Sequence, residues 1–193
     1  MSKEWLIEEK LRDAIVYAAE KHDTQARKGT SIPYLVHPMN VCKILLRYGA
    51  GLDLAMAGVL HDVVEDTEAT TEEIAERFGA RVAELVSGAS EPDKGADWRT
   101  RKEHTVHSVS LCDDLDLLAL KCADKLDNLR DIQFDYEQEG ESFWGRFNTP
   151  KGKSDQEWYY GTLSEAFSNK LRHSQWEPMA RALREEFRLV FSS

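Results

Sequence analysis

Residues 52–67, LDLAMAGVLHDVVEDT, constrain the fold of this chain more than any other segment. The first half is almost wholly apolar, which predicts a helix buried in a protein core. Four ionisable side chains follow directly, namely His61, Asp62, Glu65 and Asp66. On a helix, Glu65 lies one turn beyond His61, and Asp66 lies one turn beyond Asp62. Each pair therefore occupies neighbouring positions of one face. Four such groups beside a buried helix are costly unless they are hydrogen-bonded or bind a cation.

A plainer interpretation is a helix end that frays into an acidic, solvated loop. Two further residues weigh against it. His37 stands immediately before a helix start predicted at Pro38, where its side chain can project into a site. Asp124 lies in the middle of an apolar helical stripe within residues 114–132. Each residue alone is more often a cap or a solvated side chain. Together, two imidazoles and two carboxylates suit a borderline divalent metal such as manganese or iron.

The rest of the chain is also helical in pattern, and no segment indicates a strand. Proline and glycine positions and a capping box at Thr70 and Glu73 mark helix ends. We predict a first helix that begins near Ser2. Further helices are predicted over residues 38–49, 52–67, 70–79, 80–90, 99–112, 114–132, 156–171 and 176–191. Residues 91–97 are predicted to form an exposed loop, and residues 137–155 form the least regular stretch.

Composition limits the class of protein. The 193 residues include 41% hydrophobic residues and carry a net charge of −10, which argues against a nucleic-acid partner. No apolar run approaches the roughly 18 residues of a membrane span, and the N-terminus lacks a signal-peptide pattern. The 3 cysteines show no C-x-x-C spacing and are expected to be reduced thiols. We therefore expect one soluble, cytoplasmic all-α domain over residues 1–193, with its motifs in about 15–132 and helices of 156–191 packed on them.

Three segments of this chain resemble a known family. They are ARKGTSIPYLVHP (26–38), GVLHDVVEDTEATTEEIAERFGARVAELVSGAS (58–90) and LALKCADKLDNLRDI (118–132). The chain resembles the HD-domain superfamily and, more closely, the hydrolase branch of the RelA/SpoT family. The small stand-alone members of that branch, the small alarmone hydrolases, fit its length. This resemblance implies a compact bundle of about ten helices and a bound manganese ion.

The resemblance also implies roles for individual residues. It makes four residues the metal ligands, namely His37, His61, Asp62 and Asp124. Glu65 and Asp66 are then the acid/base groups that handle the proton of the attacking water. The nucleotide base and ribose are expected to contact Arg27, Lys28 and Asn128. Basic residues are needed for the pyrophosphate arm, and the candidates are Lys102, Arg146, Lys151 and Lys153. Solvated surface charge is the alternative interpretation for these last four.

Some positions depart from the family pattern. Ile32 stands where the family loop usually carries a polar or acidic residue, and the spacing from Arg27 to His37 is about one residue longer. Asp127 replaces the usual aromatic residue or histidine. The match to the family is weak after residue 132. These differences concern base specificity and the contacts of the phosphate arm, whereas the metal-ligand set is intact.

Three functions share this set of residues. The first is hydrolysis of the 3′-pyrophosphate of ppGpp and pppGpp to GDP or GTP and pyrophosphate. The second is removal of a phosphate from another nucleotide, such as the 2′-phosphate of NADPH. The third is a non-catalytic module that binds an alarmone, which the presence of Glu65 and Asp66 disfavours. The sequence does not separate the first two, and it does not decide between a monomer and a homodimer.

Overall fold

The structure is a computed structural model that describes residues 3–90, 95–147 and 149–192. These residues form ten α-helices and one 3-10 helix, and they contain no strand, only an isolated bridge between Ala26 and Pro33. The predicted all-α fold is confirmed. The predicted helix start near Ser2 and most of the loop predicted over 91–97 lie outside the described residues.

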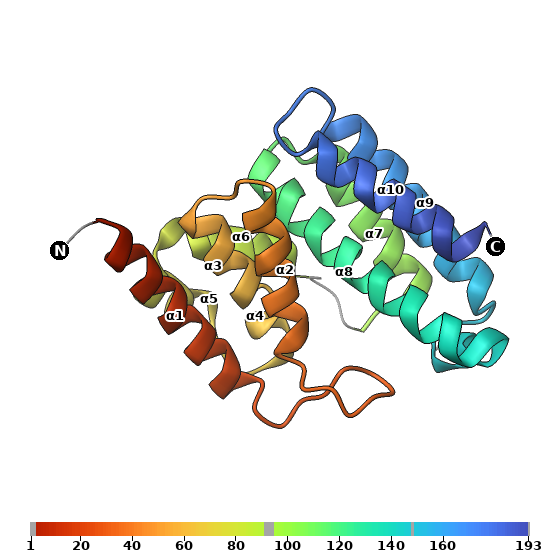
Figure 1. Cartoon of the computed structure of the whole chain (residues 1–193), viewed down its shortest axis with the longest axis horizontal. Helices are drawn as coiled ribbons and strands as arrows, with labels where there is room; N and C mark the ends of the chain where they lie inside the picture. The colour runs from red at the N-terminus through yellow and green to blue at the C-terminus, as the bar shows by residue number, and fades with distance from the viewer. Residues whose placement is uncertain (1–2, 91–94, 148, 193) are drawn as a thin grey trace. The chain divides into compact units, whose positions relative to one another are not determined.

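The helices fall into two compact units, Met1–Ser90 and Glu91–Ser193. Unit 1 contains α1 (Lys3–Lys21), α2 (Val36–Arg47), α3 (Leu52–Leu60), α4 (Val63–Asp66), α5 (Thr71–Phe78) and α6 (Ala80–Ala89) (Figure 1). Unit 2 contains α7 (Trp98–Leu111), α8 (Leu115–Glu139), η1 (Gly140–Arg146), α9 (Lys153–Lys170) and α10 (Glu177–Phe191). That residues 1–193 form a single domain stays a prediction.

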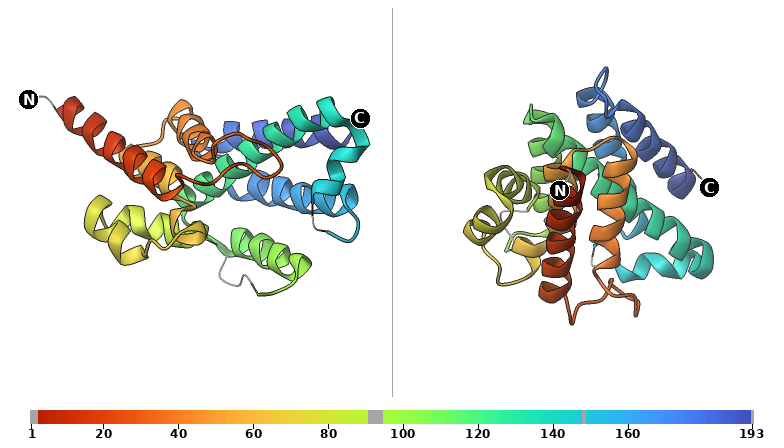
Figure 2. Two further views of the ribbon diagram at one scale, coloured as in Figure 1. Left: turned by 90° about the horizontal axis from the view of Figure 1, so that it is seen from below. Right: turned by 60° about the vertical axis from the view of Figure 1, so that its left-hand side comes forward.

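Helix α3 is the core of unit 1. Its residues from Leu54 to Leu60 are all buried, and it contacts α1, α2 and α6. Gly58 allows α2 to approach, because a Cβ at this position would lie 2.8 Å from Leu45 Cδ1 and 3.2 Å from Cys42 Cα. Residues 22–35 leave these helices as a long loop between α1 and α2, which both views of Figure 2 show. The apolar half of the 52–67 segment is therefore buried, as predicted.

The prediction of one continuous helix over residues 52–67 is wrong at its centre. Helix α3 ends at Leu60, α4 begins at Val63, and His61 and Asp62 form the turn between them. The His61 ring Nδ1 donates to Gly58 O at 3.0 Å. That carbonyl would accept from the main-chain N–H of residue 62 in a continuous helix, so the side-chain bond competes with the helical one. The carbonyl of Asp62 still accepts from Asp66 N at 2.8 Å, which keeps α4 attached to the turn.

Helix α8 is the central element of unit 2. Asp114 caps its start by accepting from Asp116 N and Leu117 N, at 3.0 and 3.2 Å. The helix continues to Glu139, seven residues beyond the predicted end at 132, and Gly140 with φ +62° ends it. Helices α9 and α10 contact α8 and each other. Both C-terminal helices were predicted, although α9 begins three residues earlier than expected, at Lys153.

Two expectations from composition can be compared with the structure. In the described ranges, no helix combines the length and the apolar character needed to cross a membrane. Cys42, Cys112 and Cys122 are free thiols, as expected, and Cys42 and Cys122 are buried.

Candidate metal centre and substrate site

Three of the four predicted metal ligands come together in unit 1. His37, His61 and Asp62 each bring a ligand atom within 4.8 Å of the other two. His37 lies in the first turn of α2, and the other two form the turn between α3 and α4. Asp62 Oδ2 lies 3.1 Å from His61 Nε2 and 3.7 Å from His37 Nε2. Both imidazoles are buried, whereas the Asp62 side chain retains 18% exposure. We call these three residues the metal cluster.

The hydrogen bonding of His61 indicates what the metal cluster can hold. A carbonyl oxygen can only accept, so the contact of Nδ1 with Gly58 O places a hydrogen on Nδ1. In the neutral ring, Nε2 then carries the lone pair, and this atom faces the Asp62 carboxylate at 3.1 Å. Two acceptor atoms at this distance need a cation between them, either a proton or a metal ion. A fixed tautomer with its second nitrogen bound to a carbonyl is the usual state of a metal-ligating histidine, so the cluster fits a divalent ion.

A second set of side chains, for which no role was predicted, supports the metal cluster. Tyr34 Oη donates to Asp62 Oδ2 at 2.6 Å, and the Tyr34 ring lies against the buried His22 ring, with centroids 4.9 Å apart. His22 Nδ1 is hydrogen-bonded to Gln25 Oε1 at 2.8 Å, and Gln25 Nε2 donates to Asp66 O at 3.0 Å. The loop after α1 is thus tied to both ends of α4. The three-residue spacing between Tyr34 and His37 is the only sequence signal for this arrangement.

The predicted acid/base residues lie directly after the metal cluster. Glu65 and Asp66 belong to α4, whose four residues begin one position after Asp62. Glu65 is half-buried, whereas Asp66 is exposed. Their short separation from Asp62 along the chain keeps both carboxylates within about one helical turn of this predicted metal ligand. Their role in proton transfer stays a prediction.

The fourth predicted ligand lies in unit 2, on α8. Asp124 Oδ1 accepts from Asn128 Nδ2 at 2.5 Å, because residues four positions apart lie on the same face of α8. Asp124 Oδ2 lies 2.6 Å from Lys125 Nζ. Burial lowers the pKa of Lys125, but its electrostatic interactions with Asp124 and with the hydroxyls of two nearby tyrosines outweigh burial and leave that pKa well above its ordinary value. Lys125 is therefore a cation beside the Asp124 carboxylate. Its role as a ligand and that of Asn128 in ribose binding stay predictions.

The predicted base-binding residues lie in the loop between α1 and α2. The Arg27 guanidinium carbon stands 5.8 Å from the centre of the Tyr34 ring, which itself contacts the metal cluster through its hydroxyl. Arg27 N donates to Ile32 O at 2.9 Å and closes the loop that contains the extra residue. Lys28 is exposed. The structure thus brings Arg27, but not Lys28, into contact with a residue of the site.

The four candidate phosphate contacts all belong to unit 2 and have different surroundings. Arg146 forms ion pairs with Asp135, at 2.7 Å, and with Glu139. Lys153 Nζ lies 3.6 Å from a carboxylate oxygen of Glu141. The carboxylate partners of Arg146 and Lys153 offset their charges, which favours the surface-charge interpretation for both.

The other two candidates, Lys102 and Lys151, have different surroundings. Lys102 Nζ lies 5.2 Å from the centre of the Tyr159 ring. The Lys151 side chain is exposed, and its main-chain N donates to Asp155 Oδ2 at 2.9 Å. Phosphate binding by any of the four residues stays a prediction.

This chain is similar in sequence and in fold to known proteins. The family model for the HD domain matches residues 14–152, and the chain belongs to the HD-domain family. Within that family it is similar to proteins named for ppGpp hydrolysis. It is 39% identical over 125 residues to guanosine-3′,5′-bis(diphosphate) 3′-pyrophosphohydrolase MESH1 of Danio rerio, a match of 63% of this chain and 68% of that protein. It is 38% identical over 126 residues to the Aquifex aeolicus enzyme named guanosine-3′,5′-bis(diphosphate) 3′-pyrophosphohydrolase, covering 64% of this chain.

Two solved structures have similar folds. The crystal structure of lmo0812 from Listeria monocytogenes EGD-e is 36% identical, with a TM-score of 0.74 over 81% of this chain and 99% of that one. A metazoan SpoT orthologue, described as hydrolysing ppGpp and acting in starvation responses, is 30% identical. Its TM-score is 0.76 over 93% of this chain and 94% of that one. The matched region covers only 18% of the length of the Aquifex relative.

Proposed function

We propose that this protein is a metal-dependent phosphohydrolase that removes the 3′-pyrophosphate of ppGpp and pppGpp, releasing GDP or GTP and pyrophosphate. The observation that carries the proposal is the buried metal cluster, in which the contact of His61 Nδ1 with Gly58 O directs Nε2 at the Asp62 carboxylate. Two carboxylates follow it on α4, which suits an enzyme better than a binding module. The names of the similar proteins support ppGpp as the substrate.

The residues that would hold the ion are the metal cluster and Asp124, and we propose Mn²⁺ because this set combines two imidazoles with two carboxylates. When bound, such an ion lowers the pKa of a coordinated water and offsets the charge that develops on phosphoryl oxygens. Asp124 carries its negative charge beside Lys125, at 2.6 Å. Binding of the ion by Asp124 would therefore compete with this ion pair.

The chain's own residues would then orient the substrate and move the proton. Arg27 would stack on the base, as it already stands over the Tyr34 ring at 5.8 Å. Asn128 would bind the ribose and direct its 3′ position toward the ligand set. Glu65, half-buried on α4, would accept the proton of the attacking water, with Asp66 beside it. The water oxygen bonds to the 3′-linked phosphorus, the bond from that phosphorus to the ribose oxygen breaks, and the ribose oxygen takes a proton.

Metal analysis tests the ligand assignment. Purified His61→Ala and Asp124→Ala should each lose the divalent ion, because each removes one of four ligands. Glu65→Gln should retain it, since this residue is not a proposed ligand. Full metal occupancy in both ligand variants would refute the assignment.

The assignment of ppGpp as the substrate is tested by measuring turnover of ppGpp and of NADPH side by side in the presence of Mn²⁺. We expect ppGpp to be the better substrate and Glu65→Gln to lower kcat by on the order of 100-fold or more. Arg27→Ala should instead chiefly raise KM, since it removes binding that the ground state shares with the transition state. The matched control is Arg12→Ala, which removes an exposed guanidinium of the same unit and should change neither constant. NADPH turnover exceeding that of ppGpp would indicate the phosphatase alternative.

A further inference from the structure

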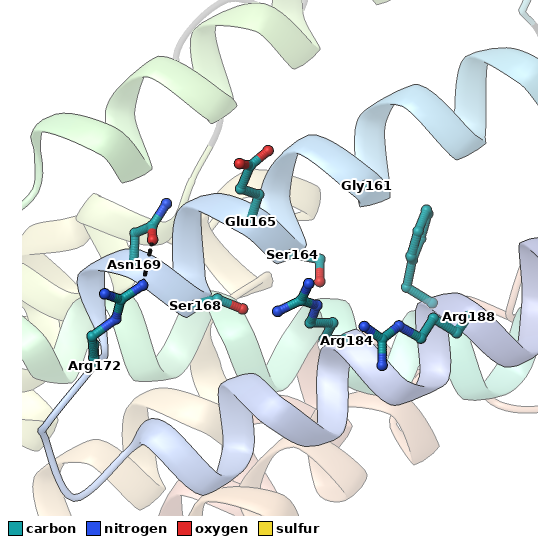
Figure 3. Close-up of a pocket in the computed structure, with 9 residues that line it drawn as sticks. Gly161, Ser164, Glu165, Ser168, Asn169, Arg172, Arg184 and Arg188 are labelled. Atoms are coloured by element: carbon teal, nitrogen blue, oxygen red, sulfur yellow. Dashed lines mark hydrogen bonds between the residues drawn. The ribbon is translucent and has the colours of Figure 1, made fainter.

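A groove between α9 and α10 gathers three arginines within unit 2 (Figure 3). Arg172 follows the end of α9, whereas Arg184 and Arg188 lie one turn apart on α10. The groove has a volume of about 510 Å³, within the range of small-molecule sites. It shares no residue with the proposed metal ligands or the proposed acid/base pair. The proposed hydrolase site therefore does not explain why three arginines line this groove.

The charge of the groove is unusual for this chain. The protein carries a net charge of −10, and several arginines elsewhere in unit 2 have acidic partners, as Arg130 does with Glu186 and Arg146 with Asp135. Among the residues that the structure describes, no carboxylate lies within 4.0 Å of the guanidinium nitrogens of Arg184 or Arg188. Like charges at i and i+4 repel each other on a helix. Two such arginines without acidic partners indicate a surface suited to an anion.

The wall opposite α10 supplies hydrogen-bond donors. In Figure 3 the Arg184 side chain points from α10 toward Ser164 and Ser168 on α9. Ser164 is only 3% exposed, so its hydroxyl lies at the base of the groove. Arg172 Nη2 donates to Asn169 Oδ1 at 3.1 Å, which turns the amide so that its NH₂ group remains a donor. Hydroxyl, amide and guanidinium donors are the groups that bind phosphoryl oxygens.

Two residues shape and limit the groove. A Cβ on Gly161 would lie 3.1 Å from Phe187 Cζ, so the absence of a side chain at Gly161 lets the two helices approach closely at this end. Glu165 places an exposed carboxylate on the lining, which opposes an anion. Three guanidinium groups against one carboxylate still leave the lining positive.

We propose that this groove binds an anion with two or more adjacent phosphoryl groups, either pyrophosphate or the polyphosphate chain of a nucleotide. Side chains at i and i+4 start about 5–6 Å apart, which allows Arg184 and Arg188 to contact neighbouring phosphoryl groups. Each guanidinium offers a planar pair of donors to one phosphate. Arg172 would bind from the end of α9. A single phosphate would leave part of this charge uncompensated.

Calorimetric titration of the full chain with inorganic pyrophosphate, after removal of divalent metal, tests the proposal. We expect one binding site, which Arg184→Gln/Arg188→Gln weakens by about tenfold or more. Arg181→Gln is the matched control, because Arg181 lies on the same helix outside the groove and pairs with Glu177. Glu165→Gln should strengthen binding, since it removes the opposing charge. His61→Ala should leave the affinity unchanged, which separates the groove from the metal cluster.

Two further arms complete the test. Ser168→Glu, which adds a carboxylate to the wall, should abolish binding without removing an arginine. Titration with GTP distinguishes a nucleotide ligand from free pyrophosphate. If GTP binds more tightly than pyrophosphate, and the double arginine variant loses this binding, the ligand is a nucleotide. If GTP binds with equal or lower affinity, the ligand is the free anion. Absence of pyrophosphate binding to the native chain would overturn the proposal. Binding that His61→Ala abolishes and the double arginine variant retains would also overturn it.

Discussion

Gly58→Ala is expected to disturb both the core of unit 1 and the metal cluster. The added Cβ would lie 2.8 Å from Leu45 Cδ1, 3.2 Å from Cys42 Cα and 3.3 Å from Cys42 N. Leu45 is fully buried and has little room to rotate, and the Cys42 atoms belong to the backbone of α2. Relief of the overlap therefore requires α2 and α3 to move apart.

The size of the effect follows from two opposing contributions. Overpacking of a core costs about 1–3 kcal/mol of the free energy of unfolding, and contacts with backbone atoms, which cannot rotate away, place Gly58→Ala in the upper part of that range, at about 2–3 kcal/mol. Replacement of a helical glycine by alanine returns about 1 kcal/mol. A net destabilisation of about 1–2 kcal/mol corresponds to a fall in Tm of about 2–8 °C for a chain of this length. Separation of the helices also moves His37 of α2 away from His61, whose ring is bound to the Gly58 carbonyl, so metal affinity should fall as well.

Thermal unfolding followed by circular dichroism at 222 nm, together with metal titration, measures both effects. Gly145→Ala is the matched control, because a Cβ there meets nothing within 4 Å. This control should leave the Tm equal to or slightly above that of the native chain and should leave metal affinity unchanged. If Gly58→Ala proved as stable as the native chain, or bound the metal equally well, the packing argument would be refuted.

Three other predictions concern single side chains. Burial raises the pKa of the Cys42 thiol to about 11, so at pH 8 only about one molecule in a thousand carries its thiolate. Iodoacetamide should therefore label Cys112 but not Cys42 in the folded chain, as peptide mass spectrometry would record, and rapid labelling of both would contradict this. Tyr34→Phe removes the hydroxyl bonded to the cluster carboxylate and should weaken metal affinity by about 10–100-fold in a chelator competition, with secondary structure unchanged. Thr70→Ala removes the cap of α5 and should cost about 1 kcal/mol in urea unfolding, whereas no shift of the midpoint would contradict the cap.

The helices and the unit 1 cluster could largely be predicted from the sequence, because their signals are local. Apolar periodicity identified the buried α3, and the capping box identified α5, where Thr70 Oγ1 accepts from Glu73 N at 3.2 Å. The two imidazoles and the carboxylate of the cluster follow from short motifs placed at helix ends. Their meeting depends on the contact of α2 with α3, which the buried apolar segment implies.

Other features depend on contacts that no local pattern encodes. The helix break at His61 and Asp62 coincides with a side-chain bond to Gly58 O, the carbonyl that would accept from residue 62 in a continuous helix. The arrangement around Tyr34 depends on how residues 22–35 fold back on α4, and the groove depends on the pairing of α9 with α10. Asp124 was predicted from its place in an apolar stripe, and its role as the fourth ligand stays a prediction.

The products of ppGpp turnover test the central claim most directly. The purified chain is incubated with Mn²⁺ and ppGpp, and the products are separated by anion-exchange chromatography. The account predicts GDP and intact pyrophosphate in equal amounts, with no intermediate that has lost a single phosphate, and no turnover by His61→Ala. Stepwise release of orthophosphate, or unchanged ppGpp in the presence of bound metal, would contradict it.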